Sequence, residues 1–370
     1  MRAMEEIITL TKELIQFKTM PSKPEEINRC TAFIENFLKN CDVRYRRLDH
    51  DDVPSILVLP QGGAPILLMT HIDVVDAPDE LFMPLEEDEK LYGRGSLDDK
   101  YAVALSLVLL KEHLKRLRIV NQGQEDLPFG ILITSDEELS CNGARKALAQ
   151  VKTNFCIALD GGSVQNIVVK EKGILKLKLI SRGKAAHGAR PWLGDNAIEK
   201  LIGDYMTLKT FFGQSAPGHW HRTMNFSVIH AGKSHNQVPD YAEAVFDIRY
   251  TENDNIDELI AKMRGKIQGE LVVETKEPLF HGGESPYLEL LLNISKNTAL
   301  GFGHGASDAR FLSQHGIKGI VWGADGDQSH HSENEHVNTE SVYALYHKLD
   351  EFIKRSGEVK TVNIRPSTSS

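Results

Sequence analysis

Five short stretches of the chain place aspartate, glutamate and histidine side chains directly after apolar, strand-like runs. These are MTHIDVVD at 69–76, GRGSLDDK at 93–100, TSDEELS at 134–140, ALDGGS at 158–163 and DQSHHSENEHVN at 327–338. Carboxylates and imidazoles serve as general acids, general bases and ligands of hard metal ions. Because the carboxyl ends of parallel strands converge on one crevice, the five stretches together predict a single site rich in nitrogen and oxygen ligands.

Each stretch has a plainer interpretation when it is taken alone. His71 and Asp73 point to the same side of a strand, where a carboxylate can orient a metal-binding histidine, but a polar loop at the strand end fits equally. Asp98 and Asp99 precede a buried helix, so either an N-cap or a metal-bridging carboxylate is consistent with them. The acids at 136–138 and the polar residues at 327–338 fit a solvated loop. Only the combined set favours a metal site, for which zinc, cobalt and manganese are all suitable ions.

The elements around these stretches alternate between strand-like and helix-like patterns. Short apolar runs at 56–59, 66–69, 130–134 and 155–159 predict buried strands, and the almost wholly apolar segment 101–114 predicts a buried helix. This alternation predicts an α/β layer with a mostly parallel central sheet and flanking helices.

The pattern changes at residue 173. The order strand, helix, strand, strand, helix, strand up to about 274 is that of a ferredoxin-like α+β unit. After 284, helix-like segments at 286–298, 306–314 and 339–355 and a buried strand at 319–322 return to the first pattern. We therefore expect a catalytic domain formed by residues 1–172 and 284–370, an inserted lid or dimerisation domain at 173–283, and a disordered tail after about 360.

Composition limits the class of protein. The chain has 370 residues, 41% hydrophobic and 26% charged, with a net charge of −9. This composition is typical of a globular protein. The chain is long enough for two domains, and it is too acidic to favour binding to nucleic acid. No apolar stretch is long enough for a membrane helix. The four cysteines form no CxxC pair and are expected to be reduced thiols, so we expect a cytoplasmic protein.

Nine motifs in order resemble the di-zinc exopeptidase and deacylase family, which includes succinyl-diaminopimelate desuccinylase, acetylornithine deacetylase, aminoacylase, glutamate carboxypeptidase and tripeptide aminopeptidase. The motifs are HID at 71, YGRGSLDDK at 92, SDEE at 135, Asp160, GKAAHGARPWLGDNAI at 183, NQVP at 236, DIR at 247, GHGASDARFL at 303 and HSENEHV at 331. The resemblance implies a phosphorylase/hydrolase-like catalytic domain carrying an inserted lid. It also implies a metallohydrolase with two divalent ions, most often Zn²⁺, and with Co²⁺ or Mn²⁺ as alternatives.

The resemblance also implies roles for individual residues. In the metal site, Asp98 bridges both ions, His71 and Asp160 complete the first, and Glu138 and His331 complete the second. Asp73 orients His71, and Glu137 is the general base. His187 of the inserted domain reaches the active site of a partner subunit, so a homodimer is expected. Asn236 and Arg249 hold a substrate carboxylate.

The implied reaction is hydrolysis of the amide bond of a small N-acyl amino acid or short peptide. Glu137 takes a proton from a water that the two ions share, while the ions and His187 stabilise the oxyanion. Asp160-Gly161-Gly162 resembles the tripeptide-aminopeptidase side of the family, so an aminopeptidase or dipeptidase is the alternative. A third hypothesis is an inactive binding scaffold of the same fold. It is disfavoured because every implied metal ligand and the general base are present in the sequence.

Overall fold

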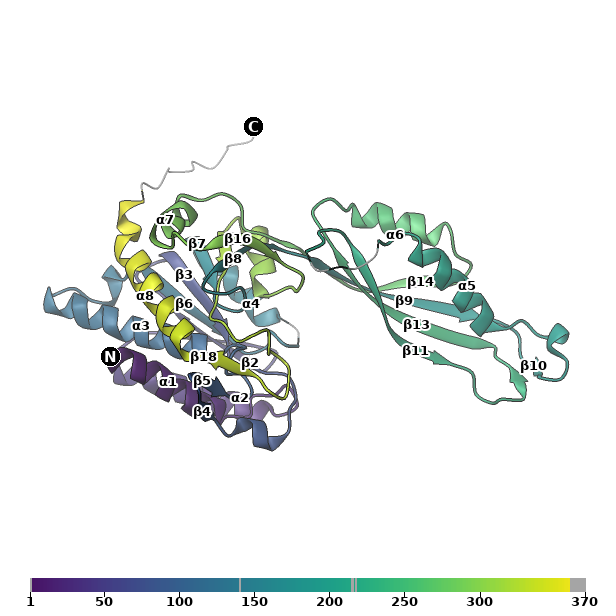
Figure 1. Ribbon diagram of the computed structural model, residues 1–370, viewed down its shortest axis with the longest axis horizontal. Helices are drawn as coiled ribbons and strands as arrows, with labels where there is room; N and C mark the ends of the chain where they lie inside the picture. The colour runs from purple at the N-terminus through teal and green to yellow at the C-terminus, as the bar shows by residue number, and fades with distance from the viewer. Residues whose placement is uncertain (1, 140, 214–215, 217, 360–370) are drawn as a thin grey trace. The chain divides into compact units, whose positions relative to one another are not determined.

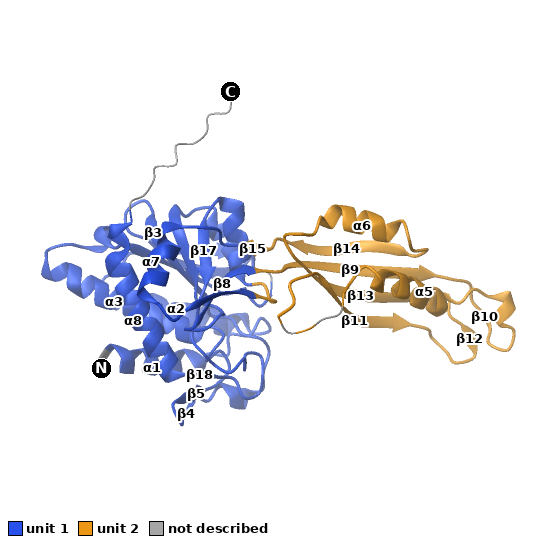
Figure 2. Ribbon diagram, turned by 45° about the horizontal axis from the view of Figure 1, so that its top comes forward, with its two compact units in different colours: residues 1–170, 281–302, 307–370 blue, residues 171–280, 303–306 orange. Residues whose placement is uncertain are grey.

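The chain folds into two compact units. The computed structural model describes residues 2–139, 141–213, 216 and 218–359, so the expected disordered tail lies outside the described residues. Unit 1 comprises residues 1–170, 281–302 and 307–370, and unit 2 comprises 171–280 and 303–306 (Figure 2). Each unit is described separately below.

The helices and strands follow one another in a fixed order along the chain. The α-helices are α1 (Arg2–Ile15), α2 (Pro24–Asn40), α3 (Lys100–Ile119), α4 (Asn142–Leu148), α5 (Ala197–Lys209), α6 (Ile256–Arg264), α7 (Pro286–Ile294) and α8 (Thr339–Arg355). The strands of unit 1 and its borders are β1 (Arg46–His50), β2 (Val53–Val58), β3 (Ala64–His71), β4 (Leu85–Glu87), β5 (Lys90–Tyr92), β6 (Phe129–Thr134), β7 (Thr153–Ala158), β8 (Asn166–Glu171), β15 (Phe280–His281), β16 (Ala299–Gly303), β17 (Lys318–Val321) and β18 (His336–Asn338).

The central sheet of unit 1 has the order β1-β2-β6-β3-β7-β17-β8-β15, with β16 beside β8. Its four middle strands, β6, β3, β7 and β17, run parallel, whereas β1, β2 and β8 pair antiparallel with their neighbours. These middle strands are the apolar runs of the sequence. The α/β class with a mostly parallel central sheet is therefore confirmed.

Helices cover both faces of this sheet. Apolar residues that alternate along the strands, such as Ile66 and Leu68 of β3, join one core with α1, α2, α3 and α8. Helices α1, α3 and α8 lie together in Figure 1. The intervening residues Leu67 and Met69 are also buried, and α4 packs on β2 and β6. Burial on both faces explains why the strands read as continuous apolar runs rather than as alternating patterns.

Two details of unit 1 differ from the expectation. Residues 306–314, expected to be a helix, form the 3-10 segment η4 (Asp308–His315). A small three-stranded sheet, β18-β5-β4, was not predicted, and it pairs His336 with Tyr92. Its strands have only three residues each, too few for a sequence pattern to reveal. This pairing brings the residue before β18, Glu335, next to the loop that follows β5.

Unit 2 is a four-stranded antiparallel sheet with two helices. The strands are β9 (Gly173–Arg182), β11 (Thr223–Ala231), β13 (Tyr241–Tyr250) and β14 (Glu270–Glu277), in the order β11-β13-β9-β14, and the chain threads them as β9-α5-β11-β13-α6-β14. This is the expected ferredoxin-like arrangement. Leu175, Leu177 and Leu179 of β9 alternate with exposed or half-exposed residues and form the core of the unit. A two-residue pairing, β10 (Ala186–His187) with β12 (Gln237–Val238), lies outside this sheet. Among the described residues, no helix combines the length and the apolar character needed to cross a lipid bilayer.

Candidate metal centre

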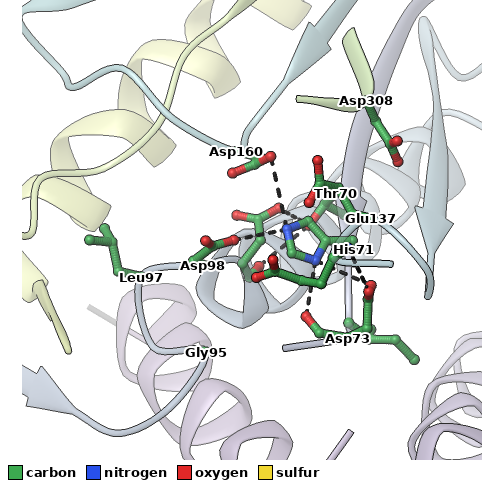
Figure 3. A network of polar contacts seen from close by, with 12 residues as sticks. Thr70, His71, Asp73, Gly95, Leu97, Asp98, Glu137, Asp160 and Asp308 are labelled. Atoms are coloured by element: carbon green, nitrogen blue, oxygen red, sulfur yellow. Dashed lines mark hydrogen bonds and ion pairs between the residues drawn. The ribbon is translucent and has the colours of Figure 1, made fainter. Parts of the chain in front are cut away.

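The centre of the site is His71, the last residue of β3. Its side chain is buried, and Nε2 lies 2.9 Å from Asp98 Oδ1 and 3.9 Å from Asp160 Oδ2. Asp160 follows the neighbouring strand β7, so its approach to His71 comes directly from the parallel register of the two strands. Figure 3 shows the imidazole ring of His71 with Asp98, Asp160 and Asp73 around it.

Asp98 joins this group to a second one. Its other oxygen, Oδ2, lies 3.1 Å from His331 Nε2, which lies 2.9 Å from Glu138 Oε1. The site therefore contains two triplets of potential ligands that share Asp98, one with His71 and Asp160 and the other with Glu138 and His331. Within each triplet the potential ligand atoms all lie within 4.8 Å of one another.

A second layer of buried groups supports these ligands. His71 Nδ1 lies 3.0 Å from the backbone oxygen of Asp73 and 3.4 Å from its Oδ1, so Asp73 contacts the ring through both groups. The Asp73 carboxylate also accepts the backbone N–H of Glu138 at 2.9 Å. Asp99 is the first residue before α3 but makes no capping hydrogen bond with its side chain. It accepts a hydrogen bond from Thr70 at 2.5 Å instead, and burial raises its pKa to about 8.

The residues of the two triplets fit divalent cations. His71 Nε2 and Asp98 Oδ1 are buried, and neither has a hydrogen-bond partner of acceptable geometry among the described residues. Buried polar atoms are rarely left in this state unless an ion or a water satisfies them. One nitrogen and several carboxylate oxygens in each triplet are also the donors that zinc and related ions prefer.

The pKa values of the site residues are shifted by the closely packed carboxylates and histidines. Hydrogen bonds to Asp98 and Glu138 raise the pKa of His331 to about 10. Burial by itself raises the pKa of the Asp98 carboxyl group, but the contact with His331 and the closeness of His71 outweigh it and hold that pKa well below its usual range. Clustered carboxylates of this kind need nearby positive charge.

Glu137 lies next to the first triplet without belonging to it. Together with His71, Asp160 and Asp308 it lines a small cavity. Burial, and then the negative charge of Asp160, raise the pKa of Glu137 well above its usual value. Arg310 of η4 lies 3.8 Å from Glu137 Oε1 and donates to Cys141 Sγ at 2.7 Å. A carboxylate with a raised pKa beside the ligands suits proton transfer at neutral pH.

A larger cavity of about 480 Å³ opens beside the ligands. Asp98 and Asp160 form part of its wall, together with Tyr101, Ser163, Asp325 and His330. The phenol oxygen of Tyr101 accepts the N–H of Ala324 and donates to the backbone oxygen of Leu159, so it ties two walls together. Of the two adjacent histidines, His331 contacts the ligand carboxylates and His330 lines this cavity.

The remaining candidates lie in unit 2. His187 is exposed at the β10–β12 pairing, where its Nδ1 accepts the N–H of Ala189 at 3.1 Å. Asn236 lies beside it, because its backbone oxygen accepts the N–H of Gly188 at 2.7 Å. Arg249 lies on β13, and its guanidinium group is engaged by Asp247, with Nε 2.9 Å from Oδ1. Unit 2 therefore brings His187 and Asn236 together, while Arg249 has a carboxylate partner of its own.

The sequence analysis did not predict that Glu335 holds the loop that carries Asp98. This residue is only 2% exposed. Its Oε1 accepts the backbone N–H groups of Gly95, Leu97 and Asp98 at 2.9, 3.1 and 3.2 Å. Its Oε2 lies 2.5 Å from Arg94 Nη1. Glu335 sits in the HSENEHV motif, but the polar composition of that segment predicted only a solvated loop.

Comparisons with known proteins agree with this geometry. A family model described as peptidase family M20/M25/M40 matches residues 67–355. The chain is 27% identical to the succinyl-diaminopimelate desuccinylase of Wolbachia pipientis, over 94% of this chain and 92% of that protein. It is 24% identical to the corresponding protein of Thioalkalivibrio sulfidiphilus, over 95% and 99%.

Solved structures share the fold at lower identity. A tripeptidase from Staphylococcus aureus matches with a TM-score of 0.81 and 19% identity, covering 96% of this chain and 99% of that one. The aminopeptidase PepT from Bacillus cereus matches with a TM-score of 0.78 and 20% identity, with the same coverage. Since the family match spans more than half of the chain and contains both ligand triplets, this chain belongs to peptidase family M20/M25/M40 and is a hydrolase of that family.

Proposed function

We propose that the protein is an amidohydrolase or exopeptidase with two catalytic divalent metal ions, most often zinc. The observation that carries the proposal is the pair of triplets that share Asp98. His71, Asp98 and Asp160 would hold one ion, and Asp98, Glu138 and His331 the other. When bound, such ions would polarise the scissile carbonyl group and lower the pKa of the attacking water. Cobalt and manganese suit the same ligands.

The side chains of the chain itself have separate tasks in this proposal. Glu137 accepts a proton from the attacking water and returns it to the leaving nitrogen, for which its raised pKa is suitable. Asp73 holds the orientation of His71 through the contacts at Nδ1. His187 donates a hydrogen bond to the oxyanion, and Asn236 and Arg249 contact the substrate carboxylate; the exposure of His187 supports its role.

The substrate we favour is a small N-acyl amino acid or a short peptide. Relatives that match almost the whole chain are named desuccinylases, which supports removal of an acyl group. The second candidate is an aminopeptidase or dipeptidase activity. It is favoured by the Asp160-Gly161-Gly162 sequence, which resembles the tripeptide-aminopeptidase side of the family, and Asp160 is a potential ligand of the first triplet.

We also propose that residues 173–283 form an inserted lid and dimerisation domain on a catalytic domain formed by 1–172 and 284–370. In unit 2, β11 is an edge strand with one neighbour, and Val228 and Ile229 on it are exposed. Helix α5 exposes Ile202 and Met206. An unpaired strand edge and exposed apolar side chains support pairing with a second copy of this chain.

One comparison tests the function. The zinc-loaded protein is given a dipeptide with a free amino terminus, its N-acetylated twin and N-succinyl amino acids, with and without a chelator. Release of acetate or succinate that the chelator abolishes supports a deacylase. Cleavage of the free dipeptide alone supports the aminopeptidase candidate. No hydrolysis of any of these substrates by metal-loaded protein would contradict the proposed substrate class.

A further inference from the structure

Tyr101 connects two of the segments that carry the potential ligands of the first triplet. It is the second residue of α3, three positions after Asp98, and it is only 1% exposed. Its hydroxyl group donates to the backbone oxygen of Leu159 at 2.7 Å. Because Leu159 directly precedes Asp160, a single hydrogen bond links the start of the helix that follows Asp98 to the residue before Asp160.

This bond lies just beyond the end of β7, where the pairing with β3 stops. The last paired residues are Met69 and Ala158, and the N–H of Leu159 still donates to the backbone oxygen of Met69 at 2.9 Å. His71, at the end of β3, is therefore connected through the strands to the segment that follows β7. Tyr101 adds the connection from that segment to α3, which strand pairing does not provide.

A second hydrogen bond fixes the hydroxyl group itself. Tyr101 Oη accepts the N–H of Ala324, which follows β17, at 2.9 Å. Gly323 permits this close approach, because a Cβ atom at that position would lie 2.6 Å from Oη and 2.8 Å from the backbone oxygen of Leu159. Burial raises the pKa of Tyr101 well above its usual value, so the hydroxyl group keeps its proton and stays a donor at neutral pH.

The alternative role for Tyr101 is packing alone, since its ring belongs to the apolar core of unit 1. A phenylalanine would fill the same space without placing a hydroxyl group between two backbone groups. Loss of that hydroxyl group leaves a buried carbonyl oxygen at Leu159 without this donor, which is unfavourable. The two roles therefore predict different results for Tyr101→Phe.

We propose that Tyr101 is a positioning residue for the first metal ion, because it holds the backbone at Leu159 and through it the carboxylate of Asp160. This inference rests on the metal centre of the proposed function. Groups that hold metal ligands in place raise the affinity for the ion, and their loss typically lowers that affinity by about 10- to 100-fold. The two hydrogen bonds of Tyr101 reach neither Glu138 nor His331, so the effect is confined to the first ion.

Calorimetric titration of the metal-free, full-length chain with zinc chloride tests this role. The wild type is expected to bind zinc in two steps. Asp160→Asn and Glu138→Gln identify the step that belongs to each ion, because each variant removes a ligand of one triplet only. Tyr101→Phe should weaken the step of the first ion by about tenfold or more and leave the other step unchanged.

Tyr250→Phe is the matched control. The hydroxyl group of Tyr250, on β13 of unit 2, also donates to a backbone oxygen, that of Glu277, at 2.6 Å, and Tyr250 is 7% exposed. The control variant loses the same kind of hydrogen bond in a segment that carries no proposed metal ligand. It should lower the thermal stability of the metal-free chain without changing its affinity for zinc, and thermal unfolding of both variants checks that they are folded.

Three results would overturn the proposal: unchanged zinc affinity in Tyr101→Phe, equal weakening of both steps, or the same loss of affinity in Tyr250→Phe. If Tyr101→Phe fails to fold, Gly323→Ala provides the test. Its methyl group would push the hydroxyl group away from the backbone oxygen of Leu159, so it should weaken the same step.

Failure of the proposed function gives a different result. If the wild type binds two zinc ions and Tyr101→Phe weakens only the first, but no amide substrate is hydrolysed, the proposed function fails and the role of Tyr101 stands. If the wild type hydrolyses these substrates and Tyr101→Phe binds both ions as tightly as the wild type, the function stands and Tyr101 has a packing role only.

Discussion

The carboxylate of Glu335 accepts a hydrogen bond from the backbone N–H of Asp98, 237 residues earlier in the chain, at 3.2 Å. The same oxygen accepts the N–H groups of Gly95 and Leu97, and the other oxygen faces Arg94. Arg94 Nη2 in turn lies 3.4 Å from the backbone oxygen of His331. Glu335 therefore connects the loop that carries Asp98 with the loop that carries His331, and both of these residues belong to the second triplet.

We predict that Glu335→Gln lowers the affinity of the protein for divalent metal by about 10- to 100-fold. A glutamine can still accept the loop N–H groups, but its amide nitrogen then faces the guanidinium group of Arg94, so two donors oppose each other. The measurement is zinc binding by competition with a fluorescent chelator. The control is Glu333→Gln, which changes an exposed glutamate of the same loop. Equal zinc affinity in Glu335→Gln and wild type would show that the loop is held by other contacts.

Replacement of the proposed base should separate catalysis from metal binding. Glu137→Gln is expected to reduce kcat by about 10²–10⁴-fold, because the proton acceptor is lost while the shape of the side chain is kept. Glu137 lies outside both metal triplets that share Asp98, so the metal content measured by elemental analysis should stay the same. Turnover close to that of wild type would remove Glu137 from the mechanism.

The exposed apolar surface of unit 2 predicts the oligomeric state. Met206 on α5 is 55% exposed and Ile229 on β11 is 51% exposed. If a second copy covers this surface, Met206→Glu combined with Ile229→Lys should convert a dimer to a monomer, as measured by sedimentation velocity. Ile119→Lys is the matched control, because Ile119 of unit 1 is 82% exposed and lies outside the proposed interface. A wild-type chain that sediments as a monomer at micromolar concentration would exclude the dimer.

Away from the site, Asp350 on α8 predicts how stability depends on pH. It accepts hydrogen bonds from His113 at 3.0 Å and Arg116 at 2.6 Å, both on α3, and from Lys354. Burial alone raises the pKa of Asp350, but these three partners outweigh it and lower that pKa well below its usual range. Because the unfolded chain has an aspartate pKa of about 3.9, it binds more protons than the folded chain as the pH falls below that value.

The stabilising effect of Asp350 should therefore be complete above about pH 5 and decline below about pH 4. Asp350→Asn is expected to cost about 1–3 kcal/mol of unfolding free energy at neutral pH, and the difference from wild type should shrink in acid. Urea unfolding at several pH values measures it, with Glu351→Gln as the control at the next, more exposed position. A difference that does not change with pH would mean that packing, and not charge, sets the contribution of Asp350.

Much of the fold could be predicted from the sequence, because its main elements have strong local patterns. The apolar runs that became β3, β6 and β7 are buried on both faces, and the alternating pattern of β9 is that of a sheet with one covered face. The order of helices and strands in unit 2 could likewise be predicted. The three-residue strands β4, β5 and β18 could not be predicted, since so few residues carry no distinguishable period. The apolar pattern of residues 306–314 predicted a helix but did not distinguish the 3-10 form of η4 from an α-helix.

The sequence by itself determined which residues are chemically able to form the site: the acids and histidines that follow apolar strands, and the family motif order in which they occur. Only the tertiary structure decided how they meet. The parallel pairing of β3 with β6 and β7 places the ends of three strands together, and Asp98 then reaches both His71 and His331. Contacts such as those of Glu335 with the 95–98 loop join segments more than 200 residues apart, and such contacts depend on packing of the whole unit rather than on any local pattern.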